Sequence, residues 1–382
     1  MQAFAFNTTP SIVFGAGSIA RLGELAAARL GRRILLVTDA GLVRAGLVEP
    51  ALVSLRTAGC ETAVFDAVVA DPPESVIAAA VAAAREHGAD AVIGLGGGSS
   101  LDVAKLVALL VRSGEALADV YGVGNARGPR LPLLLAPTTA GTGSEVTPIS
   151  IVTTGAHEKK GVVSPILLPD VALLDPRLTL GLPPHVTAAT GVDAMVHAIE
   201  AYVSASPNAN PVSRALAREA LRLIGGSIRT AVHDGADLVA RSAMLLGSLL
   251  AGQAFANSPV AAVHALAYPL GGHFGIPHGL SNALVLAPVM RFTMAACGPA
   301  YCELAGCVFP DLAGTQDAAE FVSRLEALGR DLGLQPRLRD VGVPEDALDL
   351  LAEDAMKQTR LLVNNPRPVT LADARAIYAA AW

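Results

Sequence analysis

Residues 89–105 read Ala-Asp-Ala-Val-Ile-Gly-Leu-Gly-Gly-Gly-Ser-Ser-Leu-Asp-Val-Ala-Lys, and this stretch decides the fold of the first half of the chain. Its first seven residues predict a strand buried on both faces, as in a parallel sheet. The three glycines allow close approach of the backbone to a ligand, and the amide groups of a following helix favour an anion. Strand, loop and helix in this order predict a diphosphate site over Gly97, Gly98 and Ser99, although a plain glycine-rich turn is the alternative. Asp102 falls in the first helical turn, where the dipole favours a carboxylate that can tie down the loop.

Two segments nearer the N-terminus extend this pattern. Residues 32–39 read as a second buried strand, and Asp39 stands at its carboxyl end, where a carboxylate can accept bonds from a ribose diol and repel a 2′-phosphate. An ordinary capping aspartate is the alternative. Residues 15–20, Gly-Ala-Gly-Ser-Ile-Ala, resemble a weak dinucleotide fingerprint, and an ordinary strand-to-helix turn is the favoured explanation.

A further strand, residues 131–136, runs into a loop rich in threonine and glycine at 137–148. Its hydroxyl and amide groups suit a polar ligand, and a lysine at 159 or 160 is in range of a ribose or phosphate unless it is simply solvated. Alternating strands and helices predict an α/β domain with a largely parallel sheet. The Leu-Gly-Leu-Pro-Pro run at 180–184 ends this alternation. We therefore predict an α/β dinucleotide-binding domain at 1–183 and an all-helical metal-binding domain at 184–382.

The second half contains five of the eight histidines of the chain between His197 and His278. Asp193 and His197 are four residues apart in a helix-favouring run, so their side chains emerge on one face. A carboxylate with imidazoles is a ligand set for a divalent metal such as iron or zinc. Any one of these histidines alone is more simply explained as a core residue.

Composition narrows the classes of protein further. The chain has 382 residues, of which 52% are hydrophobic and 16% charged, and its net charge is −6. The absence of a basic stripe argues against nucleic acid as a partner. We expect no membrane span and no signal peptide. The four cysteines lack a usual zinc spacing and are expected to be buried hydrophobes in a reducing cytoplasm.

Four long motifs together resemble the iron-containing (group III) alcohol dehydrogenase family. They are Gly-Gly-Gly-Ser-x-x-Asp-x-Ala-Lys at 96–105, Pro-Thr-Thr-Ala-Gly-Thr-Gly-Ser-Glu at 137–145, Gly-Val-Asp-Ala-x-x-His-Ala-Ile-Glu-Ala at 191–201, and His-Ala-Leu-Ala-x-Pro-Leu-Gly…Pro-His-Gly-x-x-Asn-Ala at 264–283. The similarity spans nearly the whole chain. It implies a nucleotide domain and a helical domain with the metal between them, in the architecture shared with dehydroquinate synthase.

The resemblance also assigns residues. The four metal ligands of the family fall on Asp193, His197, His264 and His278. We expected Pro269, Gly271, Gly272 and Pro277 to turn the chain back between the last two ligands. The expected NAD-contacting residues, with Asp102 as a loop anchor, are Asp39, Gly97, Gly98, Ser99, Asp102, Thr138, Thr139, Thr142, Thr147 and Lys160.

Two positions depart from the family pattern. Tyr268 stands where many relatives carry a histidine associated with proton relay, and a tyrosine, with its reference pKa of about 10, is a poorer proton shuttle at neutral pH. His273 is the alternative for that role. Residues Asp71 and Pro72 replace the Asn-Pro of many relatives, which leaves an adenine contact there open.

The resemblance implies an NAD-dependent oxidoreductase of the alcohol dehydrogenase type, with Fe²⁺ or else Zn²⁺ as a Lewis acid, acting on a small or medium alcohol or aldehyde. A cytoplasmic homodimer is expected. The alternatives on the same scaffold are a maleylacetate reductase, a hydroxyacid–oxoacid transhydrogenase and a dehydroquinate synthase-like lyase. The last is disfavoured because the motifs are poor in Lys and Arg. A non-catalytic nucleotide-binding subunit would have lost a metal ligand, and none is lost.

Overall fold

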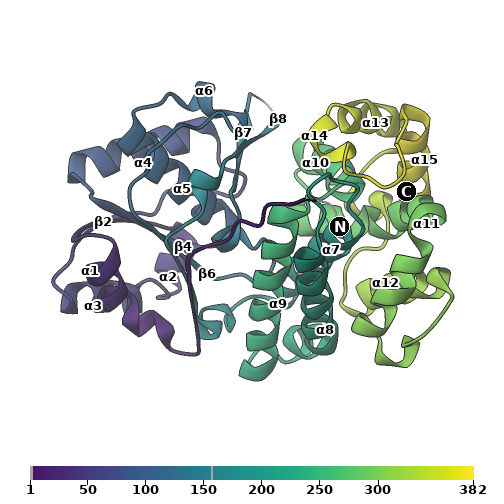
Figure 1. Ribbon diagram of the computed structural model, residues 1–382, viewed down its shortest axis with the longest axis horizontal. Helices are drawn as coiled ribbons and strands as arrows, with labels where there is room; N and C mark the ends of the chain where they lie inside the picture. The colour runs from purple at the N-terminus through teal and green to yellow at the C-terminus, as the bar shows by residue number, and fades with distance from the viewer. Residues whose placement is uncertain (1–2, 156–157) are drawn as a thin grey trace. The chain divides into compact units, whose positions relative to one another are not determined.

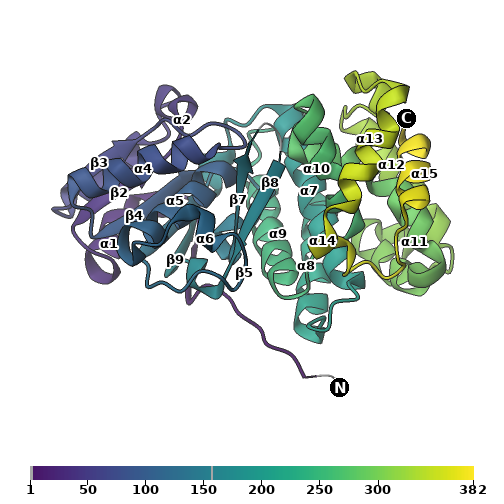
Figure 2. The same cartoon turned by 90° about the horizontal axis from the view of Figure 1, so that it is seen from above.

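The computed structural model describes residues 3–155 and 158–382, which form two compact units. We call residues 7–139 and 143–180 the sheet unit, and the described residues up to Phe6, Ala140–Thr142 and Gly181–Trp382 the helical unit. The change of unit at Gly181 lies beside the Pro-Pro pair that ends the strand–helix alternation. Two short segments that precede it in sequence, up to Phe6 and Ala140–Thr142, pack with the helices. Figures 1 and 2 show the ribbon in two views.

The sheet unit is built on six parallel strands in the order β1-β9-β6-β4-β2-β3. Their bounds are β1 Ser11–Phe14, β2 Arg33–Val37, β3 Glu61–Phe65, β4 Ala91–Gly96, β6 Leu133–Pro137 and β9 Val171–Leu174. Strands β4, β6 and β9 are buried along their whole length. Such uninterrupted burial is why their sequences are continuously apolar rather than alternating. The predicted parallel α/β domain is confirmed.

Helices cover both faces of this sheet. Its helices are α1 Leu22–Arg29, α2 Ala40–Arg44, α3 Glu49–Thr57, α4 Glu74–His87, α5 Gly98–Ser113 and α6 Leu117–Val120. Side chains of α4 and α5 pack on one face against alternate residues of β2, β4 and β6. Side chains of α1 and α3 pack on the other face, as Figure 1 also shows. All the carboxyl ends of the parallel strands therefore meet at one edge of the sheet, where the βα loops gather.

A second, three-stranded sheet lies outside the strands that the sequence predicted. It has the order β5-β8-β7, with β5 Gly122–Val123, β7 Ile149–Thr154 and β8 Glu158–Val163. Strands β7 and β8 pair antiparallel, and β7 alternates between half-buried and buried residues. This hairpin was not predicted because its two strands carry few large apolar residues, so the period-two signal is weak.

The helical unit contains no strand from Gly181 to the C-terminus, which confirms the predicted all-helical second half. Its helices are α7 Pro184–Val203, α8 Pro211–His233, α9 Leu238–Asn257, α10 Ala262–Phe274, α11 His278–Val308, α12 Ala318–Asp331, α13 Leu348–Met356, α14 Thr359–Leu362 and α15 Leu371–Ala381. Helices α9 and α11 are long and apolar enough to cross a membrane. In the fold, 67% and 50% of their most apolar windows are buried against the rest of the molecule, as in core helices of a globular protein.

One expectation about local structure was wrong. Pro269, Gly271 and Gly272 do not turn the chain back, because α10 continues through all three to Phe274. Pro269 is buried inside that helix. Burial of the apolar face outweighs the local cost of a proline and two glycines, so tertiary packing overrides propensity here. The actual turn between α10 and α11 is short and follows Gly275, whose φ of 63° ends α10 in the left-handed region.

The glycine pair at 15 and 17 has a structural explanation. Gly17 has a φ of 83°, and its N–H donates to Asp175 Oδ1 at 2.9 Å. The N–H of Ile19 donates to Asp175 Oδ2 at 3.1 Å. Because the buried Asp175 holds this turn from within the sheet unit, residues 15–20 form an anchored strand-to-helix turn.

Candidate metal centre and nucleotide edge

Three helices of the helical unit bring Asp193, His264 and His278 together. They belong to α7, α10 and α11, and their ligand atoms all lie within 4.8 Å of one another. Asp193 Oδ1 is 3.9 Å from His264 Nε2 and 3.7 Å from His278 Nε2. Two atoms that each lie about 2.1 Å from one ion are at most about 4.2 Å apart. Both distances from Asp193 Oδ1 to the imidazole nitrogens therefore suit a shared divalent cation.

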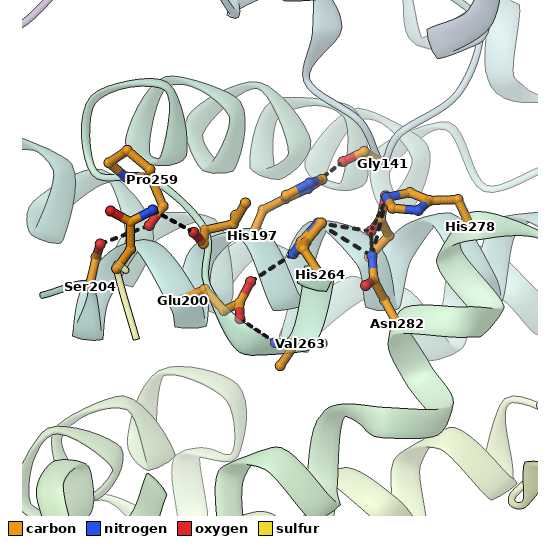
Figure 3. Close-up of polar contacts among 12 residues, drawn as sticks. Gly141, His197, Glu200, Ser204, Pro259, Val263, His264, His278 and Asn282 are labelled. Atoms are coloured by element: carbon orange, nitrogen blue, oxygen red, sulfur yellow. Dashed lines mark hydrogen bonds and ion pairs between the residues drawn. The ribbon is translucent and has the colours of Figure 1, made fainter. Parts of the chain in front are cut away.

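Asn282, one turn into α11, directs its amide group toward these side chains, and Figure 3 shows its contacts with His264 and His278. Its Nδ2 donates to Asp193 Oδ1 at 2.5 Å and lies 3.3 Å from Nε2 of both His264 and His278. Its Oδ1 is buried and has no hydrogen-bond partner among the described residues. We call these four residues the metal cluster. The carboxylate and the two imidazoles direct their lone pairs at this one amide N–H group. One oxygen and two nitrogen ligands of this kind fit a divalent metal such as iron or zinc.

His197 lies directly beside the metal cluster. Its ring stacks between Phe255, at 4.2 Å between centroids, and His264, at 4.7 Å. Its Nδ1 is 3.2 Å from the carbonyl oxygen of Gly141, to which it can donate (Figure 3). That bond leaves Nε2 with the lone pair needed by a ligand. The structure thus gathers the ligand atoms of three predicted residues and places the fourth against them.

Burial sets the protonation of this site. Burial lowers the pKa of His197 to about 3, so its imidazole is neutral near pH 7. Burial would raise the pKa of Asp193, but the charges of His197, His278 and His264 and the Asn282 amide together bring it below its ordinary value. A carboxylate and a neutral imidazole are the forms that bind a metal. The side chain of His278 is 39% exposed, which gives the cluster an accessible side.

Tyr268 and His273 lie in different surroundings. The ring of Tyr268 is 5.9 Å from the ring of His278, so it borders the metal cluster. His273 bonds through Nε2 to Asp354 of α13. It is nine residues after His264 in α10, which corresponds to about 13 Å at 1.5 Å per residue. Of the two candidates, Tyr268 is the one beside the predicted ligands.

The predicted nucleotide residues of the sheet unit share one edge of the sheet. Asp39 directly follows β2, and its Oδ1 caps α2 by accepting from Leu42 N at 3.1 Å. Gly97 precedes α5, and Gly98 and Ser99 are the first residues of that helix. Thr138 and Thr139 follow β6, beside the same loop, since Thr138 N donates to Gly96 O at 2.9 Å. These residues lie where parallel α/β sheets bind nucleotides.

Asp102 and Lys105 have a structural task behind this edge. Lys105 is fully buried, and its Nζ donates to Ser144 Oγ at 2.8 Å, Thr147 Oγ1 at 3.2 Å and Ile149 O at 2.6 Å. Asp102 accepts from Ser144 Oγ at 2.6 Å and from Ile151 N at 2.9 Å. Both side chains thus fasten the 143–151 segment to α5. Asp102 was expected to tie down the glycine loop before α5, but its side-chain bonds hold the 143–151 segment instead.

The other residues expected to contact NAD do not all lie at this edge of the sheet. Thr147 is buried against Lys105, while Thr142 belongs to the segment that packs with the helical unit. Lys159 pairs with Asp71 at 2.5 Å, and Asp71 N donates to Ser99 Oγ at 3.3 Å, so this pair adjoins the glycine loop. Lys160 is directed to Glu158, at 3.4 Å, and to the ring of Tyr121.

Glu200, Asn282 and Lys105 were present in the motifs but received no role from the sequence. A signal existed for two of them. Glu200 is seven residues after Asp193 on the same face of α7, and Asn282 is four after His278 on α11. Extending the ligand face of each helix by one or two turns would have found both.

Comparisons with known proteins identify the family of this chain. Residues 9–176 match the iron-containing alcohol dehydrogenase family, and residues 187–382 match the C-terminal region of the Fe-containing alcohol dehydrogenase family. The chain belongs to this family and is an oxidoreductase of the alcohol dehydrogenase type. It is therefore a member of a family that uses iron and NAD(H).

Individual relatives cover nearly all of the chain or all of it. Long-chain-alcohol dehydrogenase 1 of Geobacillus thermodenitrificans (strain NG80-2) is 46% identical over 361 residues, which are 93% of this chain and 91% of that protein. A crystal structure of 1,3-propanediol oxidoreductase superposes with a TM-score of 0.96 at 37% identity, over 100% of both chains. A sulfoacetaldehyde reductase from Bifidobacterium kashiwanohense in complex with NAD+ gives a TM-score of 0.89 at 28% identity, over 100% of this chain and 99% of that one.

Proposed function

We propose that this enzyme interconverts a small or medium alcohol and its aldehyde with NAD(H), using a divalent metal held by Asp193, His197, His264 and His278. The observation that carries the proposal is the convergence of three of these side chains on the amide nitrogen of Asn282. We propose Fe²⁺ as the metal, with Zn²⁺ as the competitor for the same nitrogen and oxygen ligands. When bound, such a metal supplies a Lewis acid that polarises the substrate oxygen.

The side chains of the helical unit prepare this chemistry. Histidine binds a metal as a neutral imidazole and aspartate as a carboxylate, so this ligand set carries one negative charge when it binds a metal, which favours a divalent cation over an anion. Phe255 covers one face of His197 and excludes water from it. Tyr268, next to His278, offers a hydroxyl that can hydrogen-bond to an alcohol or pass on its proton. Because tyrosine titrates far above neutrality, we assign Tyr268 an orienting role first and proton transfer second.

The residues of the sheet unit are proposed to hold the cofactor. The N–H groups at the start of α5 face an anion, so Gly97, Gly98 and Ser99 are placed for a diphosphate. Asp39 is proposed to accept from the ribose diol and to disfavour the 2′-phosphate of NADP. Thr138, Thr139, Thr142 and Thr147 are proposed to line the rest of the nucleotide site. Of the two lysines on β8, Lys159 has the stronger support because it adjoins the Ser99 loop through Asp71.

Metal analysis of the purified protein and an NAD(H)-coupled assay with a series of alcohols and aldehydes test the proposal. We expect about one metal ion per chain and net NADH formation from a primary alcohol alone. If NADH forms only transiently, or turnover requires a second carbonyl substrate, the reaction is a lyase or a transhydrogenase instead. If the enzyme reduces maleylacetate but no simple aldehyde, it is a maleylacetate reductase.

We further propose that the enzyme works as a cytoplasmic homodimer, as expected from the family resemblance. Sedimentation equilibrium across a tenfold range of protein concentration measures the state directly, and fractionation of producing cells measures the location. A monomer throughout that range, or recovery with the membrane fraction, would contradict this part of the proposal.

A further inference from the structure

Glu200 is a buried carboxylate in the helical unit that has no part in the proposed ligand set. It is 4% exposed and lies on the same face of α7 as Asp193 and His197, seven and three residues before it. A buried acidic side chain is costly unless its oxygens are fully hydrogen-bonded. Its partners therefore reveal what it does.

Both carboxylate oxygens of Glu200 are used, and both contacts are with α10. Oε2 accepts from His264 Nδ1 at 2.7 Å, and Oε1 accepts from the N–H of Val263 at 2.7 Å. Figure 3 shows Glu200 on one side of the His264 ring and Asn282 on the other. The first contact fixes the ring, and the second fixes the backbone that carries it.

The bond to Val263 serves the N-terminus of α10. This helix starts at Ala262, and the residue before it, Ala261, has no side chain that can cap it. The N–H of Val263 is one of the first-turn donors that lack a partner within the helix. A carboxylate from α7 supplies that partner and also meets the positive end of the helix dipole. The position of His264, one residue further, is thereby tied to the helix that carries Asp193.

The bond to the imidazole decides which ring nitrogen faces the cluster. When Nδ1 donates to Glu200, Nε2 carries the lone pair. Nε2 is the atom that lies 3.3 Å from the amide donor of Asn282 and 3.9 Å from Asp193 Oδ1. The contacts of both ring nitrogens thus favour the tautomer with the proton on Nδ1, which is the tautomer that binds a metal through Nε2.

His197 and His264 differ in the acceptor at Nδ1. His197 has the neutral carbonyl oxygen of Gly141 at 3.2 Å, whereas His264 has a carboxylate oxygen at 2.7 Å. A carboxylate is the stronger acceptor and makes the opposite ring nitrogen a better electron donor. Of the two stacked imidazoles, only that of His264 has a charged acceptor at Nδ1 in these contacts.

We propose that Glu200 is a positioning residue that orients His264 and strengthens its Nε2 as a metal ligand, acting through the histidine and not on the substrate. The inference rests on the proposed function to the extent that His264 binds the metal. Its alternative is a purely structural role, in which Glu200 does no more than cap α10.

Glu200→Gln separates the two roles, because glutamine offers one oxygen for two donors. It can still cap Val263, but its NH₂ group then faces Nδ1 and favours the tautomer with a proton on Nε2. Glu200→Asp keeps the charge with a shorter reach and serves as the conservative variant. Glu303→Gln is the matched control, since Glu303 is a carboxylate of the same unit that bonds to Tyr202 of α7 and not to a predicted ligand.

The test measures the metal affinity of the full chain by competition with a chromophoric chelator, using Co²⁺ and Zn²⁺, and the visible absorption of the Co²⁺ form. We expect Glu200→Gln to weaken metal binding about 10- to 100-fold and to change the Co²⁺ spectrum. We expect Glu200→Asp to lie between it and the parent, and Glu303→Gln to match the parent. NAD affinity, measured by fluorescence titration, should stay within about twofold in all three.

Parent-like affinity and an unchanged Co²⁺ spectrum in Glu200→Gln would overturn the inference while leaving the proposed function intact. A parent protein that binds neither metal would overturn the proposed function, and the inference with it. If Glu200→Gln fails to fold, the test rests on Glu200→Asp. Parent-like metal affinity in that variant would overturn the inference. A severalfold loss of metal affinity with a parent-like circular dichroism spectrum would support it.

Discussion

Two clusters of buried charged and polar groups, one in each unit, differ in their balance of hydrogen-bond donors and acceptors. The lysine cluster of the sheet unit consists of Lys105, Asp102, Ser144, Glu145 and Thr147. Its ammonium group has three acceptors at 2.6–3.2 Å and a carboxylate oxygen at 3.5 Å. In the metal cluster, a carboxylate and two imidazole nitrogens share one amide nitrogen.

This difference separates a structural site from a binding site. A buried lysine whose donors are matched by acceptors has no capacity left for a ligand, so its effect is to hold the 143–151 segment on α5. Acceptors that outnumber donors attract a cation when water is excluded. The metal cluster is therefore expected to fail in ligand binding when altered, and the lysine cluster in stability.

The largest effect is expected for Asp193→Ala. Removal of the carboxylate takes away the only anionic group among the proposed ligands, so metal content and turnover should fall by at least about a thousandfold, or about 4 kcal/mol. NAD should still bind, because its proposed residues belong to the sheet unit, except Thr142, and none of them is a proposed metal ligand. Metal analysis, initial rates and NAD titration measure these three quantities. Full activity in a metal-free variant would show that the metal cluster is not a metal site required for turnover.

Lys105→Met should instead reduce the free energy of unfolding by about 3–5 kcal/mol, because it leaves the buried Ser144 and Thr147 and the partly buried Asp102 without the cation. Denaturant titration at pH 7 measures this loss. The control is Lys357→Met, at a lysine that pairs with Asp354 but is 73% exposed, where the change should stay within about 0.5 kcal/mol. A loss in Lys105→Met no greater than in the control would show that the lysine cluster is not structural.

Glu145 should make the stability of the lysine cluster depend on pH. Burial raises its pKa from 4.5 to about 7, and the folded state therefore holds the proton more tightly than the unfolded state. Stability is fully present below pH 4.5 and is lost as the pH rises through 7, by up to about 3 kcal/mol. Between pH 5 and pH 8, the parent should lose about 2–3 kcal/mol more than Glu145→Gln, whose amide cannot ionise. Parallel slopes for the two proteins would contradict this account.

At the rim of the sheet unit, Asp39→Asn should raise the ratio of kcat/KM with NADP to that with NAD about tenfold, or about 1.4 kcal/mol. The substitution removes the charge that would repel a 2′-phosphate. It keeps the cap on α2, because asparagine is as good a cap as aspartate. A change in the ratio would therefore not reflect a folding defect. Steady-state kinetics with both cofactors measure the ratio, and an unchanged ratio would remove Asp39 from cofactor selection.

The smallest effect is expected at the rim of the metal cluster. Tyr268→Phe removes one hydroxyl beside His278 and should lower kcat about two- to tenfold without changing metal content. Tyr268→His, which restores the residue of many relatives, should recover or raise kcat at neutral pH because imidazole exchanges protons there. If both variants match the parent in kcat, the hydroxyl has no part in turnover.

Much of this outcome could be predicted from local patterns. The strand at 91–96, the glycine loop and the helix after it are recognisable because a buried parallel strand is continuously apolar and a phosphate loop needs glycine. The positions of Asp193 and His197 follow from the helical period. The β7–β8 hairpin and the continuation of α10 through Pro269 could not be predicted, because packing against distant residues decided both.

The sequence by itself determined the two-part architecture and which residue types were available for a metal and a nucleotide. These depend on periodicity and on short motifs, which are local. Only the tertiary structure decided that Asn282 joins the predicted ligands, that Glu200 bonds to His264 from another helix, and that Lys105 fastens the 143–151 segment. Each of these contacts links residues far apart in the chain or fixes an orientation within a packed interior, and neither spacing nor composition specifies such geometry.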